Sequence, residues 1–456
     1  MTSNDDVFVH AAEELDGILN AGAGMYLHRI RTPGAPPLRA ALGFSLQPMD
    51  SGLVVCLADV SDAAEGAAGY TDFPVLVDRR VAAATRAFFV RSFECAHSAT
   101  PDSAGNEGTR RDSLDSTPHV TRAALRDMSP EHVALAWACA PQVDLFALLR
   151  RGWLRDTCFA TCAPASRHNI LRRVVKEYVL LDLFLSLCPK LKSLWEYRHW
   201  LCSRMHAHGF FAETLADINE AALPIAPFVT QDDELFFICA HNHPLNYNAW
   251  HYRRQRLHLL HTNSWESGAR RDLAHAVVLA DSKAVTHFVR EHNGDSSATS
   301  YLLFLLHEQD ALDEKAHPSH HIAGEAMQED GVGTRASQLW RTLMALTQTE
   351  IRWHSEKGHE CMWHLRLGLV QWACTRPPER SVRSQWTIAD ELTWTAAYAD
   401  LHLVDGTNNR LSPVGVLPHP WTECSGSPAW TSYSAARYGC RLCAFLSGAS
   451  THGRQN

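Results

Sequence analysis

Histidine and cysteine are the residue types in this chain that could hold a metal ion, and the sequence has 27 and 13 of them. The densest histidine groups are His241-Asn242-His243 and His317-x-x-His320-His321. Neither has cysteine or carboxylate partners at the spacing of zinc fingers or metalloproteases. Cys158-x-x-x-Cys162 and Cys440-x-x-Cys443 are single pairs with no second half. We therefore expect no metal on this chain and interpret its cysteines as reduced, buried thiols.

Motifs for nucleotide binding and for acid–base catalysis are missing as well. Gly22-Ala23-Gly24 and Gly331-Val332-Gly333 lack the third glycine of a dinucleotide loop, and no P-loop sequence occurs. Glu13-Glu14 and Asp232-Asp233-Glu234 are interpreted as carboxylates at helix starts, where the helix dipole favours negative charge. These local motifs therefore assign no chemical activity to the chain, and its function has to be inferred from how its helices are arranged.

Composition narrows the class of protein. The chain has 456 residues, of which 46% are hydrophobic and 20% charged, which suits a soluble globular protein with a large core. The formal net charge of −8 disfavours a role in coating nucleic acids, which requires a positive surface. The acidic start, the lack of a long apolar run and the lack of a prenylation box predict a cytoplasmic protein that does not span a membrane.

Three stretches share a pattern of tryptophan followed three residues later by arginine. The pairs are Trp195 with Arg198, Trp250 with Arg253, and Trp363 with Arg366. In the first two a proline stands six residues before the tryptophan, and a helical apolar segment lies upstream of each pair. Residues three apart share a helix face, so each unit is expected to be helix, turn, helix, with the indole buried between stacked pairs. The arginine is expected to stack on that indole and to donate to carbonyls that end the neighbouring helix.

Two weaker copies extend the repeat. In one copy Pro141 precedes Arg150 by nine residues, as Pro189 precedes Arg198, and Ala147 stands in the tryptophan position. The other copy, residues 291–306, keeps Asp295 and Tyr301 but has Thr299 and Leu302 in place of tryptophan and arginine. The expected organisation begins with a helical N-terminal region over 1–95, which has short strands at 53–60 and 73–77 and a helix at 79–93. A disordered linker over 96–120 follows, and then a helical-repeat region over 121–375 with a mobile insertion at 307–336. The last part, over 376–456, is expected to be a helical or irregular extension.

The stretch Pro244-Leu245-Asn246-Tyr247-Asn248-Ala249-Trp250-His251-Tyr252-Arg253 resembles the repeat of protein prenyltransferase α subunits. The segment Gly358–Arg366 and the Asp295 copy resemble the repeats of its divergent branch, the prenyltransferase α-subunit repeat-containing proteins. The resemblance covers about residues 130–375. It implies an all-α, right-handed α/α superhelical solenoid that wraps a separate β subunit, and that subunit holds the catalytic zinc and the lipid pocket.

The resemblance also implies the activity and its residues. The chain would be the α subunit of a heterodimer that transfers a farnesyl or geranylgeranyl group from its diphosphate to a protein cysteine. Lys190 matches a family lysine that supports catalysis at the diphosphate, Tyr247 matches a diphosphate-contacting tyrosine, and Asn248 stands where well-studied members have a histidine. Only six lysines occur in the chain, which gives Lys190 weight. The alternative is a non-catalytic helical scaffold that binds protein partners, which the substitutions at the weaker copies and at Asn248 favour.

Overall fold

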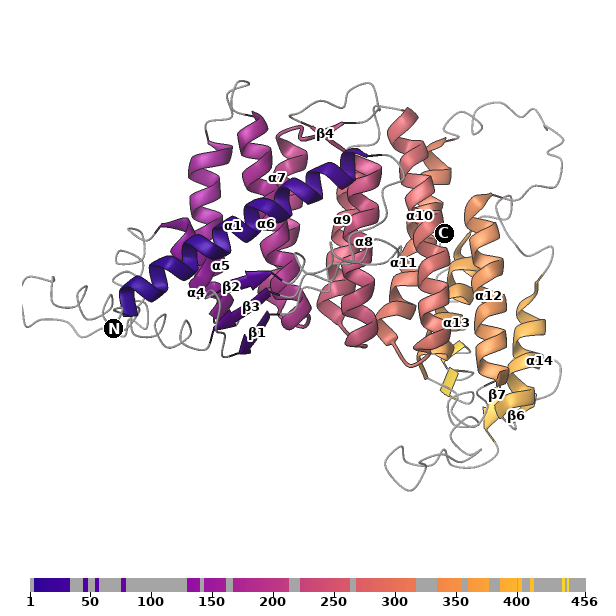
Figure 1. Cartoon of the computed structure of the whole chain (residues 1–456). Coiled ribbons are helices and arrows are strands. Elements are labelled where there is room, and N and C mark those ends of the chain that lie inside the picture. Colours follow the sequence, from indigo (N-terminus) through magenta and orange to yellow (C-terminus); the bar gives the residue numbers. More distant parts are fainter. Residues whose placement is uncertain are drawn as a thin grey trace, which may run out of the picture. The chain divides into compact units, whose positions relative to one another are not determined.

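The computed structural model describes residues 4–32, 44–47, 54–56, 75–78, 129–139, 143–160, 167–212, 222–262, 268–316, 334–353, 360–376, 386–399, 401–403, 411–413, 437–438 and 441–442. These residues are mostly helical, which confirms the all-α prediction at the level of fold class (Figure 1). The chain divides into two compact units, Met1–Thr262 and Asn263–Asn456.

The first unit contains one long N-terminal helix, a small sheet and three helix pairs. Its helices are α1 (Asn4–Arg31), α4 (Pro130–Cys139), α5 (Asp144–Leu154, continued by the π-helical turn Arg155–Phe159), α6 (Arg167–Leu187), α7 (Lys192–Ala207), α8 (Ile225–Asn242) and α9 (Tyr247–Thr262). Strands β1 (Phe44–Gln47), β3 (Val75–Asp78) and β2 (Val54–Cys56) form a sheet in that order, with β1 parallel and β2 antiparallel to β3. Strands β4 (Phe211–Ala212) and β5 (Leu223–Pro224) pair in parallel.

The sequence predictions for the N-terminal region have mixed outcomes. Strands β2 and β3 fall at the predicted positions 53–60 and 73–77. The predicted helix at 79–93 and the predicted linker at 96–120 lie outside the described residues.

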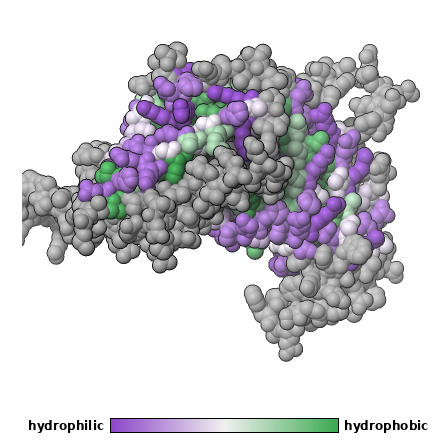
Figure 2. Space-filling view, viewed as in Figure 1, coloured by the Kyte–Doolittle hydropathy of each residue, from purple (hydrophilic) through white to green (hydrophobic). Residues whose placement is uncertain are grey.

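Helix α1 was not assigned from the sequence. It packs across α4, α6 and α8, which are the first helices of the three pairs (Figure 1). Gly22 permits its close approach to α6, because a Cβ there would lie 3.0 Å from a methyl carbon of Val179. Hydrophilic side chains cover much of this face, with smaller hydrophobic patches beside α1 (Figure 2). The buried side of the helix consists of Phe8, Ala11, Ala12, Leu15, Leu19, Ala23, Tyr26, Leu27 and Ile30, a helical spacing.

The second unit contains two helix pairs and a C-terminal part. Its elements are α10 (Gly268–Glu291), α11 (Ser296–Ala316), α12 (Arg335–Trp353), α13 (Glu360–Thr375), α14 (Ile388–Ala399) and the antiparallel strands β6 (Leu401–Leu403) and β7 (Leu411–Pro413). The predicted insertion at 307–336 is too long, because α11 continues to Ala316 and α12 begins at Arg335. Residues 437–438 and 441–442 are also helical.

Within each unit, helices in equivalent positions of neighbouring pairs pack on one another. In the first unit α6 packs on α8, while α5, α7 and α9 pack in succession. In the second unit α10 packs on α12 and α11 on α13. First helices therefore contact first helices, and second helices contact second helices, which places equivalent turns side by side.

Candidate functional site

The tryptophans of the repeat pattern are buried. Trp195, Trp250 and Trp363 are 2%, 1% and 1% exposed. The indole N–H of Trp195 donates to the carbonyl oxygen of Pro189 at 2.7 Å, so this side chain closes the turn that precedes its own helix. Trp250 packs edge-on against Phe236 of α8, with ring centroids 4.7 Å apart. The proline six residues before Trp195 thus supplies an acceptor for the indole.

The arginines are buried too, but their partners differ from those predicted. Arg198 donates to Asp232 at 2.7 Å and to Asp182, and its guanidinium lies over the ring of Tyr178 rather than that of Trp195. Arg366 likewise lies over Trp394, not Trp363. For these two arginines the predicted stacking on the repeat's own indole is therefore wrong. A buried guanidinium is stabilised far more by a carboxylate than by helix-end carbonyls.

Three of these arginine sites share an arrangement in which the arginine pairs with a carboxylate on the first helix of the next pair, and that carboxylate also accepts a tyrosine hydroxyl. We call this arrangement an Arg–acid–Tyr triad. The triads are Arg150–Glu177–Tyr197 and Arg198–Asp232–Tyr252 in the first unit and Arg366–Glu391–Tyr438 in the second. In the Asp295 copy, Tyr301 donates to Asp281 at 2.5 Å. In three cases the tyrosine follows its acid by 20 residues.

Asp232 shows that the acids of the triads have a structural role. It is 1% exposed, lies in the interior of α8 rather than at its start, and also pairs with Arg256. Its interpretation as a helix-start carboxylate is therefore wrong. Burial would raise the pKa of its carboxyl, but Arg198 and Arg256 outweigh burial and hold that pKa below the usual value.

At Asp182 burial has a larger effect on the carboxyl pKa than the neighbouring arginine has. Burial raises its pKa from 3.8 to about 6, and Arg198, which it shares with Asp232, offsets this only in part. Because the folded-state pKa lies above the unfolded one, the native state binds this proton more tightly, and the resulting stability is lost as pH rises from about 4 through 6.

Replacement of Asp182 by asparagine should therefore remove this pH dependence. The unchanged protein loses the stability of this bound proton between pH 4.5 and pH 7, and the asparagine variant does not. We therefore expect the difference in free energy of unfolding, variant minus unchanged protein, to rise by about 2 kcal/mol from pH 4.5 to pH 7. Urea unfolding at the two pH values measures this gain. A difference between the two proteins that stays constant with pH would contradict the assignment.

The three residues matched to the diphosphate site lie on neighbouring turns of the first unit. Lys190 is exposed in the turn between α6 and α7, and Tyr247, 64% exposed, begins α9 after the turn that ends α8. The side-chain amide of Asn248 donates to the carbonyl oxygen of Lys190 at 2.8 Å. The structure thus brings Lys190, Tyr247 and Asn248 to one end of the stacked pairs.

A buried asparagine fixes the spacing of these two turns. Asn246, 1% exposed, donates through its side chain to Pro189 O at 2.6 Å and accepts from the backbone N–H of Ala249. It therefore caps α9 while it ties α9 to the preceding turn. Leu245, with φ of 60°, takes the left-handed conformation that turns the chain into this cap.

Sequence reasoning missed one residue beside Tyr247. The ring of His251, one helical turn further along α9, stacks on the ring of Tyr247 at 5.7 Å with nearly parallel planes. Its spacing of four residues from Tyr247 is the signal that could have identified it. His251 adds a polar ring to the exposed surface at this end of α9.

The Lys190 side chain forms no ion pair with any residue that the structure describes, whereas Lys192 pairs with Glu196 at 3.1 Å. The two lysines are thus distinct. Lys190 keeps its charge available to a ligand, and Lys192 offers a matched control.

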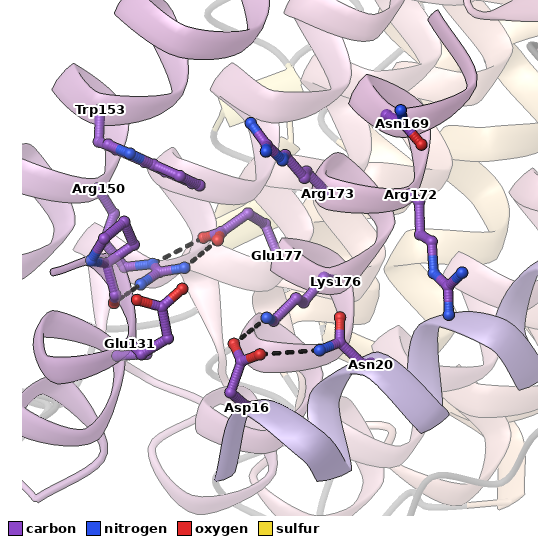
Figure 3. Close-up of a pocket in the computed structure, with 12 residues that line it drawn as sticks. Asp16, Asn20, Glu131, Arg150, Trp153, Asn169, Arg172, Arg173, Lys176 and Glu177 are labelled. Atoms are coloured by element: carbon purple, nitrogen blue, oxygen red, sulfur yellow. Dashed lines mark hydrogen bonds and ion pairs between the residues drawn. The ribbon is translucent and has the colours of Figure 1, made fainter. Parts of the chain in front are cut away.

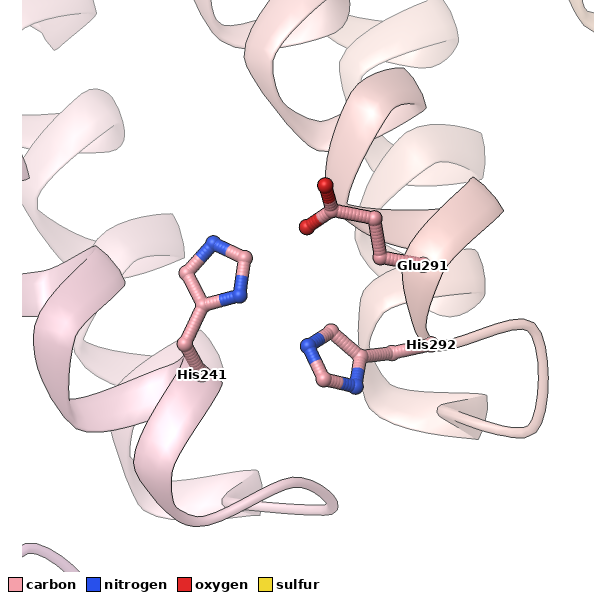
Figure 4. Close-up of side chains that lie close together, drawn as sticks. All are labelled: His241, Glu291 and His292. Atoms are coloured by element: carbon pink, nitrogen blue, oxygen red, sulfur yellow. The ribbon is translucent and has the colours of Figure 1, made fainter.

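One group of histidines and a carboxylate is divided between the two units. His241 ends α8, and Glu291 and His292 stand at the end of α10 (Figure 4). The first belongs to one unit and the other two to the other unit, so we assign them no metal site.

No family model matches the chain, and no curated protein matches it. None of the described helices is both long enough and apolar enough to cross a bilayer.

Proposed function

We propose that this chain is the cytoplasmic α subunit of a heterodimeric protein prenyltransferase, built as a right-handed α/α solenoid. The observation that carries the proposal is the juxtaposition of Lys190 and Tyr247 on two exposed turns. Asn246 and Asn248 hold those turns together through Pro189 O and Lys190 O. The contacts between equivalent helices of neighbouring pairs within each unit support the solenoid.

The reaction would be a substitution at the first carbon of the prenyl chain. The cysteine thiolate forms a C–S bond, the C–O bond to the diphosphate breaks, and the electron pair leaves with the diphosphate. The zinc on the β subunit would favour loss of the thiol proton to solvent. This chain would supply donors that stabilise the negative charge developing on the diphosphate.

In this role Lys190 would contribute charge, and Tyr247 a hydroxyl donor. The hydroxyl of Tyr247 has no hydrogen-bond partner among the described residues, so it is free to donate to a ligand. One N–H of Asn248 is already used on Lys190 O, so Asn248 serves mainly to hold the turn.

We expect Lys190→Ala to slow single-turnover prenyl transfer about tenfold or more in the assembled heterodimer, since one lost donor to a developing anion costs up to 10²–10³ in rate. Lys192→Ala is the matched control, because that lysine is 72% exposed and engaged with Glu196. Tyr247→Phe should slow transfer less, by several-fold. Equal rates for the two lysine variants would contradict a diphosphate role for Lys190.

A non-catalytic scaffold is the second candidate. The buried residues Thr299 and Leu302, at 3% and 0% exposed, replace the tryptophan and arginine of one pair, and this favours a role in packing alone at that pair. A scaffold predicts partner binding with no effect of Lys190→Ala on any transfer reaction.

A further inference from the structure

A cavity between α1 and α6 has an unusual lining for an acidic protein. Its volume is about 340 Å³, and its described lining residues are Gly24, Leu27, His28, Arg31, His168 and Arg172. Four of the six are basic or can become so, and none is acidic. In a chain with 50 acidic and 42 basic residues, this is a local reversal of the overall charge.

A second cavity of about 320 Å³ adjoins the first at Arg172, which lines both. It adds Asn169, Arg173 and Lys176 from α6, and Trp153 from α5 (Figure 3). In Figure 3 the side chain of Arg172 is directed toward α1, and that of Arg173 toward Trp153.

The acidic residues of this second cavity lie at its other end. Glu177 is engaged by Arg150, and Asp16 is engaged by Lys176 and by the amide of Asn20. Glu131 lies beside Arg150 (Figure 3). The described lining of the first cavity, by contrast, includes no acidic side chain.

Arg172 stands at that junction. It is exposed, and it forms no ion pair or hydrogen bond with any residue that the structure describes. A guanidinium presents parallel N–H groups that match the oxygens of a phosphate, so Arg172, in a cavity that Arg31, His28 and His168 also line, favours a multiply charged phosphate.

We propose that these two cavities bind a small polyphosphate anion, with Arg172 at its centre. Their volumes, at the lower end of those of ligand sites, suit a compact diphosphate or triphosphate. Because α1 forms one wall and α6 the other, the bound anion holds α1 against α6.

This site is separate from the proposed prenyl diphosphate site. Arg172 precedes Lys190 by 18 residues, most of them in α6, so the two sites are about 25 Å apart along the helix. The proposal does not depend on prenyl transfer.

The test is isothermal titration of the full chain with inorganic pyrophosphate and with tripolyphosphate, at constant ionic strength set by sodium chloride. We expect saturable binding with one site, and we expect Arg172→Glu to weaken it at least tenfold. Arg341→Glu, which makes the same charge change on an exposed position of α12, should bind as the unchanged protein does. Lys190→Ala should also leave binding intact, so failure of this site and failure of the proposed function are distinguishable.

Hydrogen exchange of α1 supplies an independent readout. Bound pyrophosphate should slow exchange in α1 of the unchanged protein and not in Arg172→Glu. The proposal is overturned if Arg172→Glu, with unaltered circular dichroism, binds pyrophosphate as tightly as Arg341→Glu does. It is also overturned if sulfate at equal ionic strength binds as tightly as pyrophosphate.

Discussion

Replacement of Asp232 by asparagine is expected to lower the free energy of unfolding by about 3–5 kcal/mol. The carboxylate of Asp232 is buried between Arg198 and Arg256 and accepts the hydroxyl of Tyr252 through both of its oxygens. Asparagine keeps the shape but not the charge, so it leaves two buried guanidinium groups without their shared anion. The loss should appear as a lower urea midpoint with an unchanged slope.

Asp182→Asn is the control for this prediction, because it changes a buried acid of the same cluster by the same substitution. Its carboxyl has a pKa raised to about 6 by burial, so its charged form is already costly near neutral pH. We expect Asp182→Asn to cost far less than Asp232→Asn at pH 7. Similar losses for the two variants would show that Asp232 has no special role in the first unit.

In the second unit, Glu391→Gln is expected to have a comparable effect, again about 3–5 kcal/mol. Glu391 is 1% exposed and accepts two bonds from Arg366, at 2.6 and 2.7 Å, and one from Tyr438 at 2.6 Å. It joins α13, α14 and Tyr438, which lies in a short helical segment. The variant should therefore also release α14 and that segment to faster hydrogen exchange than α12.

Asp390→Asn is the matched control for Glu391→Gln. Asp390 is the preceding residue and is exposed, and among the described residues its side chain bonds to Thr387 at the start of α14. Its loss should cost no more than a helix cap, about 1 kcal/mol. If Glu391→Gln unfolds at the same urea concentration as Asp390→Asn, the triad is not a structural element of the C-terminal part.

The sequence predicted the helical class because tryptophan and arginine three residues apart require a helix to share a face. Burial of Trp195 and Trp250 follows from the apolar segments upstream of each. The same reasoning could not place the arginine partners. Those partners lie in the next helix pair, at separations of 27, 34 and 25 residues for Arg150, Arg198 and Arg366, and no fixed spacing marks them.

Asp232 illustrates the same limit. Adjacent aspartates before an apolar run are typical of a helix start, and here the helix had already begun at Ile225. The tyrosine that follows its acid by 20 residues is a regular signal that was overlooked, since it links Glu177 with Tyr197 and Asp232 with Tyr252.

The candidate site, too, could be predicted from the sequence only in part. The family resemblance predicted Lys190, Tyr247 and Asn248 from their offsets to proline, and the turns that carry them do meet. It could not predict that Asn246 bridges the turns, because that bond depends on the depth at which α9 packs on α7. The polyphosphate cavities also depend on the docking of α1, which the sequence did not reveal.

The most direct test of the account is reconstitution of the full chain with protein prenyltransferase β subunits. The proposal predicts that one β subunit co-elutes with the chain, and that only the mixture transfers a labelled farnesyl or geranylgeranyl group from its diphosphate to a protein cysteine. Co-elution without transfer would support the scaffold instead. Failure of every β subunit to bind the folded chain would contradict the proposed function outright.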